Sequence, residues 1–350
     1  MTADSAAGTG TEFSPTDPGL APGVGGGKDA AGMGPYRLAA RRLRRNKVAL
    51  AFGLLFVLIV VLCALAPVYQ SSIAHTGPND NHVTDTIHIG GKAIDVVSPE
   101  GIPTGPTWHG RFFLGADQNG RDVAVRLLYG GRTSLEIGLL AMLITMVAAA
   151  ILGTVAGYFR GLTDGVISRV LDVIWAFPPV LLGIALGTSL ALGGVNLGLF
   201  KLQGNSLLVP AFIIGIVYIP YVAKPVRGQV LGLREKEFVD AARVQGFGPA
   251  RIIVSELLPN IASTFIVFIP LILANAILLE AGLSYLGAGV QPPNPSWGTM
   301  ISDGIRLLPG AIHLTFAPGA MLVLCVLGIN VFGDGVRDAL DPRAKVRIDH

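Results

Sequence analysis

Six long apolar runs are the feature of this sequence that most constrains its fold. The first, VALAFGLLFVLIVVLCALAP at residues 48–67, is long enough to cross the ~30 Å hydrocarbon core of a bilayer as a helix. Only 14% of the 350 residues are charged, whereas about a quarter are charged in an ordinary soluble domain. The sequence therefore predicts an all-α membrane protein with six transmembrane helices. The other five runs lie at about Ser134–Tyr158, Ser168–Leu192, Leu207–Ala223, Ile261–Ala281 and Ile312–Phe332.

Basic residues beside these runs predict their orientation. The cluster RRLRRNK at residues 41–47 leads directly into the first run, and such clusters stay on the cytoplasmic side of a membrane. With six crossings, both termini are expected in the cytoplasm and the chain in the plasma or inner membrane. The cluster could alternatively bind anionic membrane lipid or protein. The net charge of +3 is small, and the basic residues lie in short clusters beside apolar runs. This pattern does not indicate a nucleic-acid partner.

Four arginines oppose this arrangement because they fall on the outer side. The stretch RDVAVRLLYGGRTSL at Arg121–Leu135 has an amphipathic pattern, so we expect it to form a helix at the membrane interface. The four residues are Arg111, Arg121, Arg126 and Arg132.

The outer stretch between the first two runs contains a predicted β-hairpin. In TIHIGGKAIDVV, residues 86–97, apolar and polar residues alternate on both sides of a Gly-Gly pair, which is typical of a two-residue hairpin. Four histidines also lie in this stretch, but their spacing fits no metal-ligand pattern. Cys63 and Cys325 lie inside apolar runs, so we expect neither a metal site nor a catalytic residue.

A charged loop, residues 224–260, separates the fourth and fifth runs. Its second part, DAARVQGFGPARIIVSELLP, predicts two short helices divided by Gly246, which can take a positive φ without strain. Pro249 stands where a helix can restart, and Pro259 is expected to end it. Short amphipathic helices outside the membrane need an apolar partner.

The loop resembles a motif of bacterial ABC importer permeases, namely EAA, three residues, G, nine residues, I, one residue, LP. Asp240 replaces the glutamate, and Glu256 stands where the motif favours isoleucine. In that family the loop docks on an ATPase subunit, so the resemblance implies that it couples this chain to ATP hydrolysis. The matching residues are Asp240, Ala241, Ala242, Gly246, Leu258 and Pro259.

Three further stretches resemble the C-type subunit of dipeptide/oligopeptide/nickel permeases. They are LGADQNGRDVAVRLLYGGRTSL at 114–135, EAGLSYLGAGVQPPNPSWGTM at 280–300 and GDGVRDALDPR at 333–343. The resemblance implies a type I ABC importer transmembrane domain whose substrates are di- or oligopeptides. It also implies four partners: a homologous B-type permease subunit, two ATP-binding subunits and an extracytoplasmic substrate-binding protein. ATP would be bound by those subunits, leaving no cofactor in this chain.

Five regions follow from these patterns. Residues 1–35, rich in Gly, Ala, Pro, Thr and Asp, are expected to be a disordered cytoplasmic tail. Residues 36–68 hold the basic cluster and the first span, and 69–131 form the outer loop with the hairpin and the interfacial helix. Residues 132–335 form the ABC transmembrane domain with the charged loop 224–260, and 336–350 form a cytoplasmic tail.

The outer segment, residues 280–297, is a candidate outer gate. Three glycines and three prolines punctuate it, so it cannot be a straight span, and we expect a short helix and a stiff turn at the outer mouth. A tryptophan in it is expected at the level of the lipid headgroups. A plain structural loop is the alternative. The candidate gate residues are Glu280, Gly287, Pro292, Pro293 and Trp297.

Two other classes of function are alternatives for a chain of this kind. An ion-coupled secondary transporter needs ionisable groups buried inside spans, and the only candidates, Asp172 and Glu280, lie near expected span ends. Asp172 is expected to pair with Arg169 at the surface. A membrane enzyme needs a catalytic motif, and none appears within the runs. The sequence leaves open the identity of the substrate (dipeptide, oligopeptide, nickel chelate or sugar) and the residues that line the path.

Overall fold

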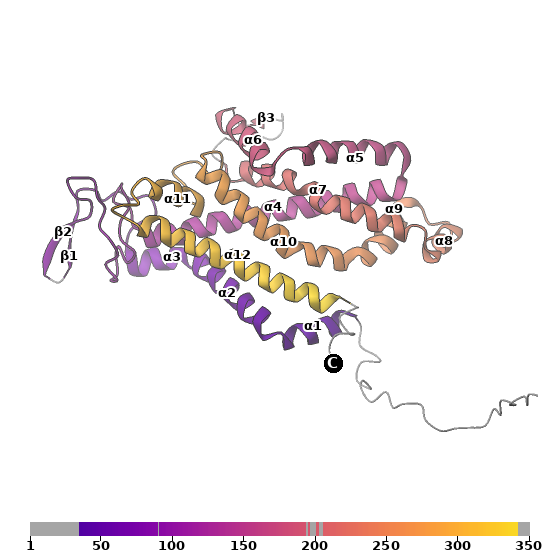
Figure 1. Ribbon diagram of the computed structural model, residues 1–350, viewed down its shortest axis with the longest axis horizontal. Coiled ribbons are helices and arrows are strands. Elements are labelled where there is room, and N and C mark those ends of the chain that lie inside the picture. The colour runs from indigo at the N-terminus through magenta and orange to yellow at the C-terminus, as the bar shows by residue number, and fades with distance from the viewer. Residues whose placement is uncertain (1–34, 90, 194, 197–200, 203–205, 342–350) are drawn as a thin grey trace, which may run out of the picture.

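The computed structural model describes residues 35–89, 91–193, 195–196, 201–202 and 206–341, which are mostly helices along one long axis (Figure 1). The first elements are α1 (Pro35–Arg45), α2 (Lys47–Ala64), α3 (Ala66–Tyr69), the π-helix η1 (Gln70–Ala74), β1 (Thr86–Ile89) and β2 (Lys92–Asp95). Next come α4 (Val123–Phe159), α5 (Gly161–Ala176), α6 (Pro179–Gly193), β3 (Val195–Asn196), β4 (Lys201–Leu202) and α7 (Leu208–Leu233). The last are α8 (Glu237–Val244), α9 (Pro249–Ile252), the π-helix η2 (Ile253–Leu257), α10 (Leu258–Tyr285), α11 (Trp297–Ile305) and α12 (His313–Leu340). Nearly all of the tail expected at residues 1–35, and most of the one at 336–350, lie outside the described residues.

Five of the helical stretches described are long and apolar enough to cross a membrane. They are α2, α4, α7, the continuous stretch Pro249–Tyr285 and α12. The pair α5 and α6 is bent by 91° at its break, and counted as one span it makes six. The all-α membrane fold with a small two-stranded sheet is thereby confirmed.

The bend between α5 and α6 differs from the straight span expected at Ser168–Leu192. α5 ends at Ala176, and Phe177 is extended, with φ −93° and ψ 135°. The residue before a proline is pushed out of the helical region by the proline ring, and Pro178 follows. Pro179 then opens α6, at a position where a missing N–H costs no hydrogen bond. The two prolines therefore divide this span.

The expectation of a separate interfacial helix at Arg121–Leu135 is wrong. Most of that stretch is the first part of α4, a single helix of 37 residues. At Gly131 a Cβ would lie 2.5 Å from Cys63 Sγ and 2.6 Å from Trp297 Cζ2. The small side of α4 therefore packs against protein instead of lying on lipid, which a periodicity argument cannot distinguish.

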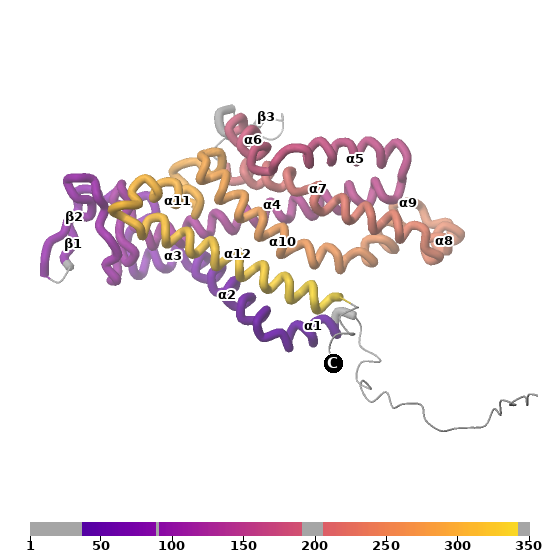
Figure 2. The backbone as a smooth tube through the Cα atoms, viewed as in Figure 1, coloured from indigo at the N-terminus to yellow at the C-terminus, as the bar shows by residue number. Residues whose placement is uncertain are grey.

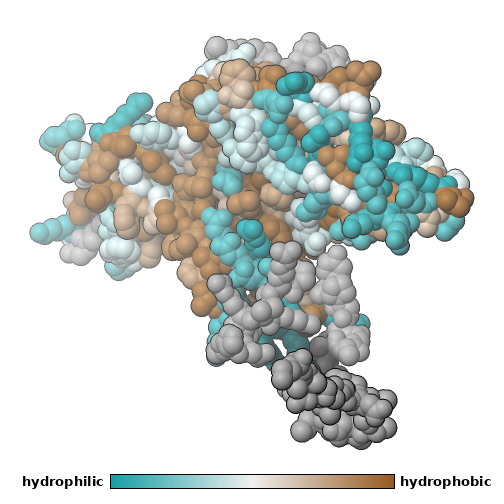
Figure 3. Space-filling model, turned by 45° about the vertical axis from the view of Figure 1, so that its right-hand side comes forward, coloured by the Kyte–Doolittle hydropathy of each residue, from teal (hydrophilic) through white to brown (hydrophobic). Residues whose placement is uncertain are grey.

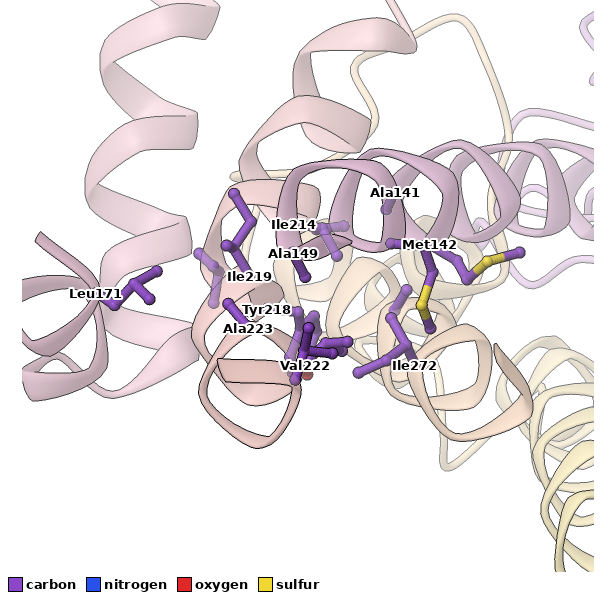
Figure 4. Close-up of a cluster of buried hydrophobic side chains, with 14 of the residues drawn as sticks. Ala141, Met142, Ala149, Leu171, Ile214, Tyr218, Ile219, Val222, Ala223 and Ile272 are labelled. Atoms are coloured by element: carbon purple, nitrogen blue, oxygen red, sulfur yellow. The ribbon is translucent and has the colours of Figure 1, made fainter. Parts of the chain in front are cut away.

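The packing of α4 against α7 forms the centre of the bundle, where buried side chains of both helices meet (Figure 4). Small residues bring the two backbones close, and a Cβ at Gly153 would lie 2.8 Å from Ala223 O. Thr145 Oγ1 donates to Gly215 O at 2.8 Å across the contact. Close approach and interhelical hydrogen bonds hold such helices together because lipid tails are as apolar as the side chains they would expose.

The two ends of the bundle carry different elements. The expected hairpin is confirmed at one end, with β1 antiparallel to β2 and Thr86 opposite Asp95, and α8 lies at the other end (Figure 2). The end of α12 lies beside α1, where Arg42 Nη1 donates to Asp341 O at 3.0 Å. Apolar residues cover much of the middle, and hydrophilic residues gather towards the ends (Figure 3). This distribution fits a bundle whose long axis crosses the bilayer.

Asp122 ties the outer loop to the first turn of α4. Its side chain accepts from Ala124 N at 2.9 Å and Val125 N at 3.1 Å, which caps the helix. The same carboxylate accepts from Phe112 N at 2.6 Å. Burial raises the pKa of Asp122, and these N–H donors oppose the rise. The outer loop is thus anchored on the bundle at a defined point.

Candidate functional site

The turn after α8 is built by hydrogen bonds that only a left-handed residue permits. Gly246 has φ +82°, donates to Arg243 O at 2.9 Å, and lets Phe247 N donate to Ala242 O at 3.0 Å. This pair of bonds is the Schellman motif that ends a helix. The expected role of Gly246 as the divider between two helices is therefore confirmed by its backbone.

The charged loop has one face that is buried against the bundle and one face that is exposed. Val239 and Ile252 are buried against the bundle, as is Ala242. Asp240 and Ala241 are exposed on the opposite side of α8. The predicted coupling residues on α8 therefore fall into two groups. Ala242 packs the loop against the bundle, whereas Asp240 and Ala241 are accessible to another protein.

Val244 is a residue that the sequence analysis did not single out. Its side chain is 89% exposed at the tip of α8, although valine is usually buried in folded proteins. It lies three residues after Ala241, so the two share one face of the helix. In the sequence, this spacing of three residues from Ala241 is the signal that could have identified Val244. An exposed face of Asp240, Ala241 and Val244 results.

The boundaries of the charged loop differ from those expected. Its first part, up to Leu233, continues α7. Its last part is helical without interruption into the span, because α9, η2 and α10 follow one another directly. Pro259 does not end the element but lies at the start of α10, directly after the π-turn η2. Leu258 is half-buried at the same point.

Ion pairs fix α7, just before the loop, to α5. Arg227 Nε and Nη2 donate to the two carboxylate oxygens of Asp164 at 2.5 Å and 2.6 Å. Lys224 Nζ lies 2.8 Å from Asp172 Oδ1, so Asp172 pairs with Lys224 and the expected pair with Arg169 is wrong. These pairs connect α7 to α5 directly before the charged loop.

The outer segment starts inside a helix and turns by the same device. Its first residues complete α10, after which Gly287 takes φ +81°. Gly287 N donates to Ser284 O at 3.1 Å and Ala288 N donates to Leu283 O at 2.8 Å. Pro292 and Pro293 follow on the surface. The expected stiff turn is present, but the short helix before it is the end of the fifth span.

Glu280 is fully buried near the end of α10, one helical turn before Ser284. Ser284 Oγ donates to its Oε1 at 2.6 Å and accepts from Val290 N at 2.9 Å. The hydroxyls of Ser134 on α4 and Ser296 before α11 face the same carboxyl. Its Oε2 has no hydrogen-bond partner within the described part of the chain. One buried carboxyl thus joins α4, α10 and the outer segment, which its place near the end of an apolar run did not reveal.

Trp297 is also buried and does not lie at the lipid headgroups as expected. Its indole Nε1 donates to Leu127 O at 3.1 Å, and its backbone N donates to Ser134 Oγ at 3.3 Å. It therefore attaches the start of α11 to α4. Across the ranges that the structure describes, no group of three or more His, Cys, Asp or Glu side chains could hold a metal ion.

Comparison with known proteins adds the family. Residues 149–346 match the family described as binding-protein-dependent transport system inner membrane component. Residues 34–84 match the N-terminal TM domain of oligopeptide transport permease C. A chain of the inward-facing MetNI methionine ABC transporter aligns with a TM-score of 0.49 and 17% identity over 62% of this chain and 96% of that chain.

Curated relatives match along most of the chain. The dipeptide transport system permease protein DppC of Alkalihalophilus pseudofirmus is 35% identical over 89% of this chain and 91% of its own length. The oligopeptide transport system permease protein OppC of Bacillus subtilis is 32% identical over 89% and 90%. The glutathione transport system permease protein GsiD of Pectobacterium atrosepticum is 33% identical over 91% and 94%. The chain therefore belongs to the family of binding-protein-dependent transport system inner membrane components and is a permease subunit, not an enzyme.

Proposed function

We propose that this permease imports di- or oligopeptides as one half of a translocation path driven by partner ATPases. The observation that carries the proposal is the exposed face of α8, held at a fixed angle by the left-handed turn at Gly246. A small, rigid, partly apolar face that projects from the end of a bundle is suited to a groove on another protein. The peptide substrate is supported by the names of the dipeptide and oligopeptide relatives.

The proposed partners follow from the two ends of the bundle. A homologous B-type permease would complete the path, and two ATP-binding subunits would receive the α8 faces of the pair. An extracytoplasmic binding protein would meet the end that carries the hairpin. ATP-driven closure of the ATPase subunits would then bias the bundle between two states. This family does not support the alternative of an ion-coupled secondary transporter.

Uptake by the reconstituted complex tests the function. Proteoliposomes that contain both permeases and the ATPases, supplied with the peptide-loaded binding protein, should accumulate labelled tripeptide only with ATP inside. A complex whose ATPase subunits cannot hydrolyse ATP is the matched control. ATP-independent accumulation driven by an ion gradient would refute the proposal.

Cysteine labelling tests the proposed orientation, in which both termini and α8 are cytoplasmic. Lys92→Cys lies in the exposed hairpin and Gln245→Cys at the exposed tip after α8, whereas the native Cys63 and Cys325 are buried. In whole cells a membrane-impermeant maleimide should label position 92 and leave position 245 unlabelled until the membrane is opened. Labelling of both from outside would show that the orientation is wrong.

A further inference from the structure

A polar cavity lies beside the outer segment. It has a volume of about 190 Å³. Gly287 and Pro292 border it on one side, Ser302 and Asp303 of α11 on another, and Arg121 lies near the start of α4. The space is large enough for several water molecules or for one end of a ligand.

The charged groups at the cavity form one cluster around Arg121. Arg126 is almost fully buried and fixed by Pro78 O at 2.9 Å and Asn79 Oδ1 at 3.1 Å. Arg121 Nε donates to Asp117 Oδ2 at 2.6 Å, and Arg126 Nε lies 3.6 Å from the same oxygen. Two guanidinium groups therefore share one closely bonded carboxylate.

The second carboxylate is held loosely. Arg121 Nη2 lies 3.7 Å from Asp303 Oδ2, which is beyond hydrogen-bond distance. Asp303 is half-exposed on α11, whereas Arg121 is mostly buried. An incoming carboxylate could therefore make with Arg121 the close hydrogen bond that Asp303 does not make. Asp303 lies beside Arg121, so a ligand that carries a positive or neutral group next to its carboxylate would suit the site.

We propose that this cavity binds a free carboxylate at the outer mouth, namely the C-terminal carboxylate of an imported peptide, and that Arg121 makes the contact. The proposal rests on the proposed import of peptides and names the part of the substrate that the permease itself recognises. An acidic side chain of the binding protein is the other source of the same chemistry, and the test separates the two.

Protection of an engineered cysteine tests the proposal in the intact complex. Ser302→Cys places a thiol at the cavity wall, and its alkylation by a neutral maleimide is timed with trialanine or trialanine amide. One charge-assisted contact supports millimolar affinity, so trialanine at about three times its Kd should slow the reaction about fourfold. The amide, which lacks the carboxylate, should not slow it.

Three variants make the outcome specific. Arg121→Gln should abolish the difference between acid and amide, and Asp303→Asn, which removes the competing carboxylate, should increase it. Arg111→Gln is the matched control, because Arg111 is an outer arginine that pairs with Asp85 instead of lining this cavity. Equal protection by acid and amide, no protection by either, or protection that survives Arg121→Gln would overturn the proposal.

Two parallel measurements separate the remaining explanations. Protection by the unliganded binding protein that depends on Arg121 would assign the carboxylate to that protein and overturn the substrate contact. Uptake of trialanine is measured on the wild-type complex. Uptake without protection would overturn only the cavity proposal, whereas protection without uptake would support the cavity and contradict peptide import.

Discussion

Replacing Gly246 with valine should uncouple the permease from its ATPases. A β-branched residue at φ +82° is strained, and the left-handed conformation costs a non-glycine residue about 1–2 kcal/mol. A Cβ at Gly246 would meet no atom within 4 Å, so the effect is conformational and not a clash. The turn should open, the exposed face of α8 should shift, and retention of the ATPases should fall roughly tenfold if about 1.4 kcal/mol of docking is lost.

The chain offers a matched control two residues further on. Gly248 also has no atom within 4 Å of an added Cβ, but its φ of −69° and ψ of 161° suit any residue. Gly248→Val should therefore keep the ATPases bound and uptake coupled to hydrolysis. Co-purification of the ATPases and uptake into proteoliposomes are the two measurements. Equal behaviour of Gly246→Val and Gly248→Val would contradict the role of the turn.

The docking face itself is tested in the same assay. Ala241→Asp places a charge on the exposed face of α8, where burial against a partner would leave it unpaired. Retention of the ATPases should therefore fall, as in Gly246→Val. Asp240→Glu keeps the charge on that face and should be nearly neutral.

Replacing Glu280 with leucine should release the outer segment and abolish uptake. The hydroxyl of Ser284 would lose its acceptor inside a buried site, and each polar group left unsatisfied there costs about 1–3 kcal/mol. Asn294→Cys in the outer segment should then react with an impermeant maleimide faster than in the parent. The measurement is the labelling rate together with ATP-driven uptake.

Glu280→Gln is the discriminating partner of that variant. Glutamine keeps the shape and one acceptor oxygen for Ser284, so assembly and uptake should remain close to those of the parent protein. A residue that carried a coupled proton would tolerate neither change. Loss of uptake in Glu280→Gln with assembly intact would therefore revive an ion-coupled role for this carboxyl.

The parts of this fold that the sequence predicted are those governed by local rules. Apolar length located the spans, and the alternation around the Gly-Gly pair located the hairpin. Gly246 was identified because the turn between the two flanking helical patterns requires a positive φ, which a glycine adopts without strain. The Pro178-Pro179 pair was visible, but how far it bends a span depends on what α6 packs against.

The parts that failed depend on contacts between distant segments. Trp297 has the composition of an interfacial anchor, yet Leu127 O and Gly131 offer it a buried place that no local pattern shows. The same holds for Glu280, whose serine neighbours come from three separate segments. Trp297 finds its hydrogen-bond partners on α4, and Glu280 faces Ser134 of the same helix, far away in the chain.

The continuous helical stretch Pro249–Tyr285 connects the two ends of the molecule mechanically. Its 37 residues span about 55 Å at ~1.5 Å per residue, so a tilt of about 5° about its end beside α8 would displace its far end by about 5 Å. The π-turn η2 and Pro270 are the two places where such a lever can flex. The stiffness of the helix between these two points determines whether a displacement beside α8 reaches Glu280 or is absorbed by bending of the helix.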